Sequence, residues 1–200
     1  VWDIDALNWI NKYSSMYKIG SGDLTAYPII EKIAEFGKPI ILSTGLSTID
    51  EISQSVKFIQ QKNSIYNSKE MLAVLQCTSM YPIPESEVNL KVLKTLKDKF
   101  NVSIGFSDHT EDIEALYLAS VLGVDVLEFH FTDTKEGKTF RDHKVSLTIK
   151  DIDLLVSKIC RAEKIIGKEE KKPTKSELEN KHHITFRRAI YPNRLIQKGE

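Results

Sequence analysis

The sequence predicts a parallel α/β fold and, within that class, part of a TIM barrel. Five short, nearly continuous apolar runs begin 22 to 33 residues apart, at positions 17, 39, 72, 102 and 126, and a helix-like stretch follows each of them. Repeated units of this kind favour either a TIM barrel or a doubly wound sheet. Every apolar run ends in polar or reactive side chains. A barrel gathers such groups from the ends of all its strands, whereas a doubly wound sheet gathers them at one switch point, so we expect a barrel.

The expected strands and helices alternate along the first two thirds of the chain. Nearly continuous apolar sequence, which is typical of parallel strands covered by helices, predicts strands at residues 17–21, 39–43, 72–77, 102–107 and 126–130. Amphipathic spacing predicts helices at 27–36, 49–61, 90–100 and 112–122. Residues 47–50 supply an N-cap signal for the second helix, and Gly123 is where the fourth would end. Five of the eight strands of a barrel are thus accounted for.

The remainder of the chain is expected to lead out of the barrel. A loop is predicted at 134–143 and a helix at 149–166, so the barrel domain would span residues 1–166. Residues 167–185 are charged and predict a solvated linker. Residues 186–200 have β-like composition and resemble the beginning of a second small domain. Because the chain begins at Val1 without a methionine, we expect it to be an excerpt of a longer polypeptide.

Composition narrows the class of protein. The chain has 200 residues, of which 41% are hydrophobic, and 28 basic side chains balance 28 acidic ones. The balanced charge provides no basic stripe, so nucleic acid is not expected as a partner. No apolar run approaches 18 residues and no signal peptide is recognisable, so we expect a soluble, cytoplasmic protein without a membrane partner. Cys77 and Cys160 are predicted to be reduced, buried thiols.

Two of the predicted strands end in histidine. His109 follows the run at 102–107, and His130 ends the run at 126–130. Strand, helix and strand in this order predict two parallel neighbours joined by a right-handed crossover, so both imidazoles would emerge at the same edge of the sheet. With Asp108 and Glu128 beside them, they predict a divalent-metal site. The alternative, that each histidine is a hydrogen-bonded structural residue, stays open at this point.

A second group of polar residues suggests an anion site. Lys18 lies at a strand end beside a Gly-Ser-Gly turn that contains Ser21, and backbone N–H groups, a hydroxyl and a cation together suit a phosphate or carboxylate. Ser43 repeats the hydroxyl theme on the next strand, and Ser107 and Thr110 add hydroxyls near the histidines. An anion beside a metal suits carbon–oxygen or phosphate chemistry. The alternative is a lysine that only reaches solvent from an ordinary turn.

The loop at 78–84 contains two prolines and follows the third predicted strand. Its Tyr81 either hydrogen-bonds a polar substrate or packs over the barrel rim, and the residues alone leave both roles open.

Five motifs, taken together and in this order, closely resemble the sialic acid synthase (N-acetylneuraminate synthase) family, which includes the legionaminic and pseudaminic acid synthases. They are Lys-Ile-Gly-Ser-Gly-Asp at 18–23, Leu-Ser-Thr-Gly at 42–45, Gln-Cys-Thr-Ser-x-Tyr-Pro at 76–82, Gly-Phe-Ser-Asp-His-Thr at 105–110 and Leu-Glu-Phe-His-Phe-Thr-Asp at 127–133. Lys-Pro-Thr-x-Ser-Glu at 172–177, before Arg187 and Arg188, extends the resemblance, which runs from about residue 17 to residue 200.

The resemblance implies an enzyme on a TIM barrel that condenses phosphoenolpyruvate with an N-acetylated amino sugar, giving a nonulosonic acid and phosphate. A divalent cation, Mn²⁺ or Mg²⁺, would polarise the aldehyde of the open-chain sugar, C3 of phosphoenolpyruvate would attack it, and water would add at C2 before phosphate leaves. His109 and His130 would be the metal ligands. The other implied site residues are Lys18, Ser21, Ser43, Ser107, Thr78 and Thr110 for phosphoenolpyruvate, Tyr81 and Asp142 for the sugar, and Glu128 and Asp23 for acid–base work or water positioning, with Lys18 also balancing anionic charge.

The chain also departs from the family pattern. Asp23 stands where familiar members have Glu, and Ser79, a further substrate-binding position, stands where they have Asn. The segment at 135–141 replaces a Pro-Gly-rich version that touches the sugar, so the acceptor is N-acetylmannosamine or a related diamino sugar. The family further implies a C-terminal antifreeze-like domain, begun at 186–200, that reaches across a domain-swapped homodimer to cover the partner's barrel.

Two rival interpretations stay open from the sequence. One is another metal-dependent TIM-barrel enzyme, such as a hydrolase, which would take a third histidine or a bridging carboxylate from strands outside this sequence. The other is a non-catalytic module that binds sugar or metal. An incomplete barrel lacks closure, so we expect the 200 residues alone to be inactive even if the whole protein is an enzyme.

Overall fold

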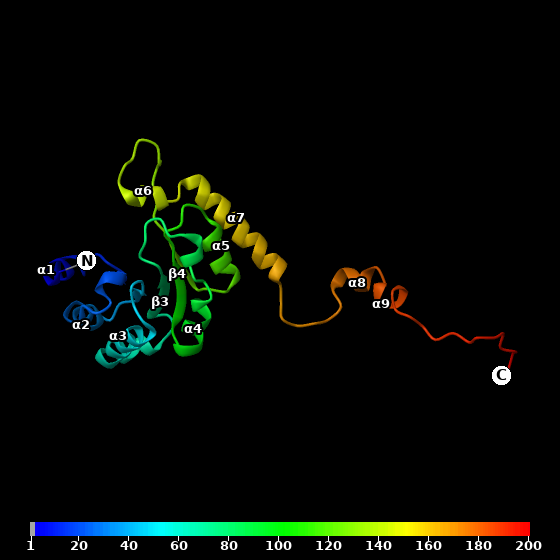
Figure 1. Ribbon diagram of the computed structural model, residues 1–200. Helices are drawn as coiled ribbons and strands as arrows, with labels where there is room; N and C mark the ends of the chain where they lie inside the picture. Colours follow the sequence, from blue (N-terminus) through cyan, green and yellow to red (C-terminus); the bar gives the residue numbers. More distant parts are fainter. Residues whose placement is uncertain (1–2) are drawn as a thin grey trace. The chain divides into compact units, whose positions relative to one another are not determined.

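The computed structural model describes residues 3–200 and divides the chain into two units, Val1–Ile165 and Ile166–Glu200. The predicted strands and helices of the first unit are confirmed, most with ends one or two residues shorter. In chain order the elements are α1 (Ile4–Ile10), β1 (Tyr17–Ile19), α2 (Tyr27–Glu35), β2 (Ile40–Ser43), α3 (Ile49–Lys62), β3 (Leu72–Cys77), α4 (Val92–Lys99), β4 (Ser103–Ser107), α5 (Glu114–Val121), β5 (Val126–Glu128), α6 (Arg141–Val145) and α7 (Ile149–Ile166) (Figure 1).

The five strands form one parallel sheet in the order β1-β2-β3-β4-β5, with each strand hydrogen-bonded to its sequence neighbour. The registers pair Ser43 with Leu75, Cys77 with Ser107, and Ser107 with Glu128. A single parallel bridge between Phe131 and Leu147 follows β5. Because all five strands are parallel, their carboxyl ends lie at the same edge of the sheet.

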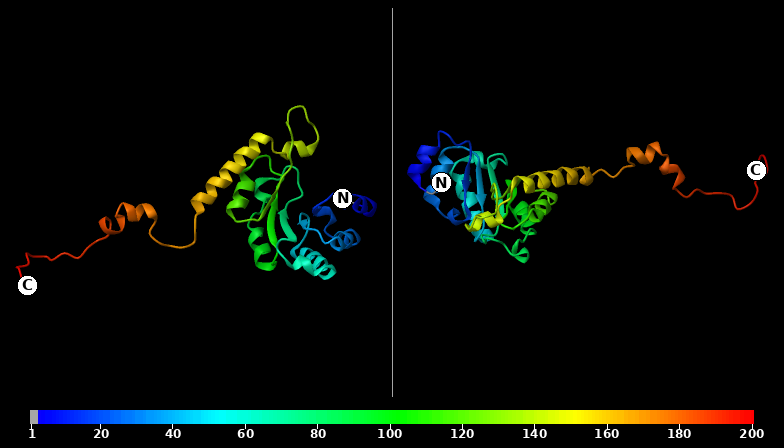
Figure 2. Two further views of the ribbon diagram at one scale, coloured as in Figure 1. Left: turned by 180° about the vertical axis from the view of Figure 1, so that it is seen from behind. Right: turned by 90° about the horizontal axis from the view of Figure 1, so that it is seen from above.

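The two faces of the sheet have different compositions, because successive side chains of a strand point to opposite faces. Residues of the outer face pack with residues of the helices in the main hydrophobic cluster. The strand residues in this cluster are Tyr17, Ile19, Ile40, Leu42, Leu72, Val74, Ile104, Phe106 and Leu127. The inner face carries the alternate residues, among them Lys18, Ser43, Cys77, Ser107 and Glu128. The views in Figure 2 show the helices along one side of the curled sheet.

A salt bridge shows that the sheet is strongly curled. Lys18 on β1 and Glu128 on β5 belong to the two edge strands, yet Lys18 Nζ lies 2.8 Å from Glu128 Oε1. In a flat sheet four interstrand steps would separate these strands by about 19 Å, farther than the two side chains can bridge. The first unit is therefore a curled, barrel-like half-sheet, in agreement with the predicted partial TIM barrel.

Close packing on the inner face requires a glycine on β4. A Cβ atom on Gly105 would lie 2.3 Å from Leu75 Cδ2 and 2.5 Å from the carbonyl oxygen of Val126. The missing side chain lets Leu75, which is fully buried, fill the space inside the curl.

The predicted end signals of the helices are present. Thr48 caps α3, and the Thr48 hydroxyl and the Glu51 carboxylate form a reciprocal capping box. Gly123 follows α5 with φ +74°, a conformation that glycine adopts without strain.

Two expectations for the first unit are wrong in part. The predicted loop at 134–143 ends in a helical turn, α6, which begins at Arg141. Cys77 is buried as predicted, but Cys160 is exposed, because it lies on a face of α7 that no described element covers.

The second unit contains two short helices, α8 (Lys175–Glu179) and α9 (His182–Thr185). Thr174 and Glu177 form a capping box at α8, so the predicted linker at 167–185 is partly helical. The expected β-like character of residues 186–200 is wrong for the described chain, which has no strand there; a segment without a partner strand leaves its backbone groups unpaired. None of the helices described in residues 3–200 is long and apolar enough to cross a membrane.

Candidate functional site

Both strand-end histidines lie together, as predicted. His109 follows β4 and His130 follows β5, and their ring centroids are 5.2 Å apart. The backbone of each segment is held by its neighbour, since the Asp108 amide donates to the Glu128 carbonyl at 2.9 Å and the Leu147 amide donates to the His130 carbonyl at 2.7 Å. The parallel register of β4 and β5 thus brings the two imidazoles to one edge of the sheet.

His109 is oriented by main-chain and thiol groups. Its Nδ1 atom lies 3.0 Å from the Thr78 carbonyl oxygen and 3.9 Å from Cys77 Sγ. A carbonyl can only accept, so Nδ1 carries a proton, and in the neutral imidazole the lone pair lies on Nε2. Burial by itself would lower the pKa of His109, but the contacts with Cys77 and with the Thr78 carbonyl outweigh it and raise the pKa. This is the arrangement by which proteins orient a ligating histidine through its other nitrogen.

The surroundings of His130 favour its neutral form. Burial, followed by the nearby charge of His109, lowers the pKa of His130, against the opposing carboxylates of Asp142 and Glu128. Its Nδ1 atom lies 3.9 Å from Asp142 Oδ2. A neutral imidazole is the form that binds a metal ion.

The residues present fit a divalent ion only in part. Asp108, predicted beside the histidines, is turned away: its carboxylate accepts from the amide and the hydroxyl of Thr110 at 2.9 and 2.8 Å. Glu128 pairs with Lys18 instead. Within residues 3–200 no group of three or more His, Cys, Asp or Glu side chains is placed to hold one ion. The two imidazoles are therefore suitable ligands, and the rest of a coordination shell would come from substrate, water or other protein groups.

The turn after β1 is tied to the turn after β2. The Gly45 amide donates to Ser21 Oγ at 3.0 Å. A Cβ atom on Gly45 would lie 2.2 Å from Ser79 Oγ and 2.9 Å from Ser21 Oγ, so glycine is needed there for the hydroxyls to approach. The hydroxyls of Ser21 and Ser79 therefore both lie beside the backbone of Gly45.

Two of the predicted substrate-binding hydroxyls are committed elsewhere. Thr78 Oγ1 donates to the Glu87 carbonyl at 2.9 Å, so Thr78 reaches the site through its carbonyl oxygen. Thr110 Oγ1 donates to Asp108.

Asp23 lies in a 3-10 turn, and its carboxylate makes no hydrogen bond or ion pair with the residues that the structure describes, so no contact joins it to the histidines.

Cys77 belongs to the site although the sequence predicted only a buried thiol. It stands in register with Ser107, which in turn pairs with Glu128 on the inner face. Burial would raise the pKa of Cys77, but His109 together with the hydroxyls of Ser21 and Ser107 lowers it. The alternation of β3 could have revealed this placement, because it puts Cys77 on the same face as the polar strand ends.

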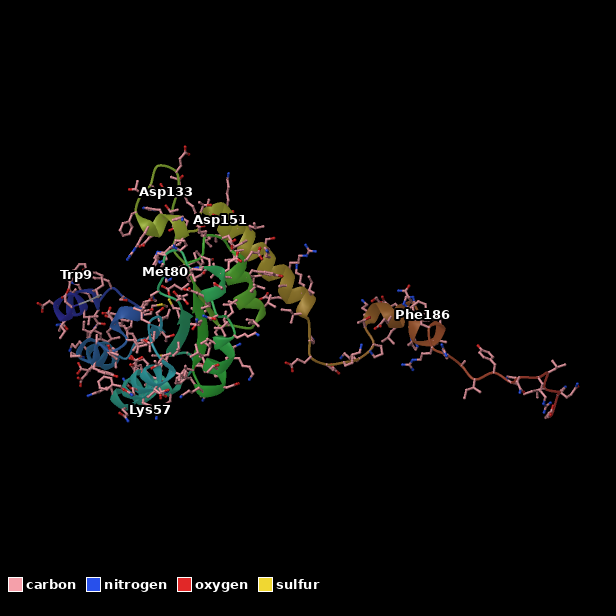
Figure 3. All side chains as sticks on the ribbon, viewed as in Figure 1. Trp9, Lys57, Met80, Asp133, Asp151 and Phe186 are labelled. Atoms are coloured by element: carbon pink, nitrogen blue, oxygen red, sulfur yellow. The ribbon has the colours of Figure 1, made fainter. Side chains whose placement is uncertain are left out.

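The ring of Tyr81 packs on the histidines. Its centroid is 4.0 Å from that of His109 and 5.7 Å from that of His130. Burial, and then the negative charges of Cys77 and Asp142, raises the pKa of Tyr81, and Arg141 opposes this shift. Figure 3 places Met80, next to Tyr81, and Asp133, in the loop after β5, at the same end of the sheet. Arg141 itself, which the sequence analysis did not single out, has its guanidinium carbon 5.0 Å from the Tyr81 centroid.

Three buried side-chain oxygens of the first unit have no hydrogen-bond partner among the described residues: Ser43 Oγ, Glu128 Oε2 and Asp142 Oδ1. Leaving such an atom unpaired costs about 1–3 kcal/mol. All three belong to residues predicted to bind substrate or act in catalysis. The arrangement therefore offers two imidazoles, a lysine and three unsatisfied oxygens to a polar ligand.

Comparison with known proteins gives a consistent result. The NeuB family model matches residues 1–171. An uncharacterised protein of Methanocaldococcus jannaschii is 43% identical over 98% of this chain and 56% of its own length. The N,N'-diacetyllegionaminic acid synthase of Campylobacter jejuni is 35% identical over 100% of this chain and 58% of its own length. The chain thus spans little more than half of these relatives.

A solved structure agrees with the fold. The N-acetylneuraminic acid synthetase of Leptospira borgpetersenii, crystallised with citrate, superposes with a TM-score of 0.81 at 30% identity, over 94% of this chain and 64% of that protein.

Proposed function

This chain belongs to the NeuB family, and we propose that the polypeptide carrying it condenses phosphoenolpyruvate with an N-acylated amino sugar to give a nonulosonic acid and phosphate. The observation that carries the proposal is the grouping, at one end of the inner face, of a lysine, two imidazoles 5.2 Å apart and three buried oxygens without partners. Such a group suits an anion and a polyhydroxy compound at the same time.

Phosphoenolpyruvate would be held by the inner face. Lys18 supplies the cation, and Ser21, Ser43 and Ser107 supply hydroxyl donors for its carboxylate and phosphate oxygens. Ser43 is the sharpest case, because its hydroxyl is buried and has no partner among the described residues. The Lys18–Glu128 salt bridge is half-exposed, so an incoming anion can share the lysine.

His109 and His130 would hold the divalent ion, Mn²⁺ or Mg²⁺. When bound, the ion supplies Lewis-acid polarisation of the acceptor's carbonyl. The contribution of the chain is to orient the imidazoles: the Thr78 carbonyl keeps the proton of His109 on Nδ1, and Tyr81 packs against both rings.

Glu128 is the proposed acid–base group nearest to the lysine. One of its oxygens pairs with Lys18, and the other, Oε2, is buried and without a partner. In the condensation, C3 of phosphoenolpyruvate forms the new bond to the sugar's carbonyl carbon, whose oxygen takes up a proton and becomes a hydroxyl. Water adds to C2, and the bond between C2 and the phosphate oxygen breaks as the new C2 hydroxyl loses its proton and becomes the keto group. Glu128 Oε2 would accept the proton of that water. Asp23 remains a weaker proposal for the same work, since no contact brings it to the site.

The acceptor would lie against Tyr81 and Asp142. Asp142 Oδ1, which has no hydrogen-bond partner among the described residues, would accept from a sugar hydroxyl, and the ring of Tyr81 would offer an apolar surface to an N-acyl group. The C. jejuni and Legionella pneumophila relatives are named N,N'-diacetyllegionaminic acid synthases, which supports a diacetamido sugar beside N-acetylmannosamine as the acceptor.

The test is phosphate release by the whole polypeptide that carries this sequence. With phosphoenolpyruvate, manganese and either sugar we expect release that depends on all three components, and a reaction without the sugar controls for simple hydrolysis. No release with any related amino sugar would contradict the proposal.

The remaining expectations concern the whole protein. We propose that a small antifreeze-like domain follows the linker, and that two copies exchange it in a homodimer. A single mass corresponding to one copy, measured by light scattering, would contradict the dimer. The cytoplasmic location stays a prediction.

A further inference from the structure

Arg141 stands beside the proposed acceptor site. Its guanidinium carbon lies 5.0 Å from the centroid of Tyr81, whose ring is in turn 4.0 Å from that of His109. A guanidinium over an aromatic face is attracted by the ring quadrupole and is thereby oriented. Arg141 is therefore one aromatic ring away from a proposed metal ligand, at the first residue of α6.

Most of its hydrogen-bond donors are free. Arginine has five N–H donors in a planar fork. The Arg141 Nε atom lies 3.5 Å from Asp142 Oδ1, which is too long for a good hydrogen bond, and no other described residue accepts from this guanidinium. Its side chain is 69% exposed. These donors therefore stand directly beside a buried carboxylate oxygen that has no hydrogen-bond partner among the described residues, a pair that matches hydroxyl or amide groups, which donate and accept at once.

The charges around Arg141 favour a neutral ligand over a sugar phosphate. Lys138 pairs with Asp133, and Lys144 pairs with Glu111 at 3.0 Å. The ammonium of Lys135 is held by main-chain carbonyls of residues 111 and 144. Arg141 is thus the cation of this segment with most of its donors free, and a carboxylate is beside it, whereas a phosphate dianion calls for several free donors or cations.

We propose that Arg141 is a specificity-determining residue that binds oxygen atoms at the end of a neutral N-acylated amino sugar farthest from its reacting carbon. This inference rests on the proposed function and names the substrate class of the same site. The adjacent Phe140 is exposed and offers apolar surface to an acyl methyl group of such a sugar.

The test compares Arg141→Ala, Arg141→Lys and Lys144→Ala in the whole polypeptide that carries this sequence. Lys144 is the matched control, because it is an exposed cation of the same helix whose charge is paired with Glu111. Kinetics of phosphate release would be measured with N-acetylmannosamine, with a diacetamido sugar and with N-acetylmannosamine 6-phosphate. Calorimetry of sugar binding gives a second readout that does not depend on turnover.

We expect Arg141→Ala to raise the KM of a neutral acceptor, and its dissociation constant, at least about tenfold, the effect of losing a hydrogen bond to a charged group. The KM of phosphoenolpyruvate and the affinity for manganese stay unchanged. Arg141→Lys restores little, because an ammonium lacks the planar fork. Lys144→Ala behaves as the wild type.

Three outcomes would overturn the inference while leaving the proposed function intact: an unchanged acceptor KM in Arg141→Ala, an equal loss in Lys144→Ala, or a wild-type preference for the 6-phosphate sugar. Absence of phosphate release from the wild type with every acceptor would refute the proposed function itself, and the inference with it.

Discussion

The two faces of the curled sheet differ where β2, β4 and β5 end, because there an apolar residue on the outer face is followed by a polar residue on the inner face. On β2, Leu42 is fully buried in the hydrophobic cluster under the helices, and the next residue, Ser43, is equally buried on the inner face. The leucine is fully satisfied by apolar contacts, whereas the serine hydroxyl has no hydrogen-bond partner among the described residues. Burial alone therefore does not tell a stabilising residue from a functional one; unmet bonding capacity does.

The same contrast extends across the sheet. The outer face closes the core with Ile, Leu, Val and Phe side chains. The inner face ends in Cys77, Ser107, Glu128 and the histidines that follow β4 and β5. We therefore expect substitutions of the polar inner-face residues to reduce activity with little loss of stability, and substitutions of the apolar outer-face residues to do the reverse.

The largest expected effect is that of His109→Ala. Removing an imidazole that would hold the metal should reduce phosphate release on the order of a thousandfold, since the ion is worth several kcal/mol of transition-state stabilisation. Manganese affinity, measured by calorimetry, should fall in parallel. His182→Ala, in the second unit, is the matched control. Unchanged manganese affinity in His109→Ala would refute the assignment.

Leu42→Ala probes the opposite face. Truncating a fully buried leucine should lower the free energy of unfolding by about 2–5 kcal/mol, because the lost contacts leave a cavity. Urea unfolding measures this loss. The KM for phosphoenolpyruvate of the protein that remains folded should not change. A raised KM at full stability would show that the two faces are not separable.

Ser43→Ala is the partner experiment one residue along the strand. The hydroxyl has no hydrogen-bond partner among the described residues, so its removal should leave the free energy of unfolding unchanged or raise it by up to about 1–3 kcal/mol. Losing a donor to the substrate anion should raise the KM for phosphoenolpyruvate about 10- to 100-fold. A large loss of stability with an unchanged KM would make Ser43 a structural residue.

How far the sequence predicts this molecule follows from the same alternation. The strand runs and the helix signals at Thr48 and Gly123 are local, and these elements were predicted correctly. The meeting of His109 with His130 followed from one rule of topology, that neighbouring parallel strands end at the same edge.

What could not be predicted depends on side-chain contacts between distant segments. The Lys18–Glu128 pair exists because the sheet curls, and no local pattern encodes that distance. Asp108 turns to Thr110 instead of the histidines, and Arg141 reaches Tyr81 across 60 positions of sequence. Asp108 was predicted beside the histidines because it precedes His109 in the sequence, and Arg141 was not predicted because it is far from Tyr81 in the sequence. In both cases packing decides the direction of the side chain.

The smallest expected effect concerns a buried hydroxyl on the helix side that, unlike Ser43, is satisfied. Tyr66 is fully buried, and its hydroxyl donates to the Lys38 carbonyl at 2.8 Å. Tyr66→Phe should lower the free energy of unfolding by about 1 kcal/mol, the usual net worth of one hydrogen bond, and leave the KM values of both substrates unchanged.

A pH series checks the same contact from the wild type. Burial raises the pKa of Tyr66 from 10.0 to about 12, against the hydrogen bond to Lys38. The folded state thus holds this proton more tightly than the unfolded state, so the stability it contributes is complete below pH 10 and is lost as the pH rises through about 12. Urea unfolding over that range should show a steeper decline for the wild type than for Tyr66→Phe, in which the titrating group is absent. If the free energy of unfolding fell equally steeply with pH in both proteins, the phenol would have the same pKa in the folded and unfolded states. The contrast between the hydrogen-bonded hydroxyl of Tyr66 and the unpaired hydroxyl of Ser43 would then lose its support.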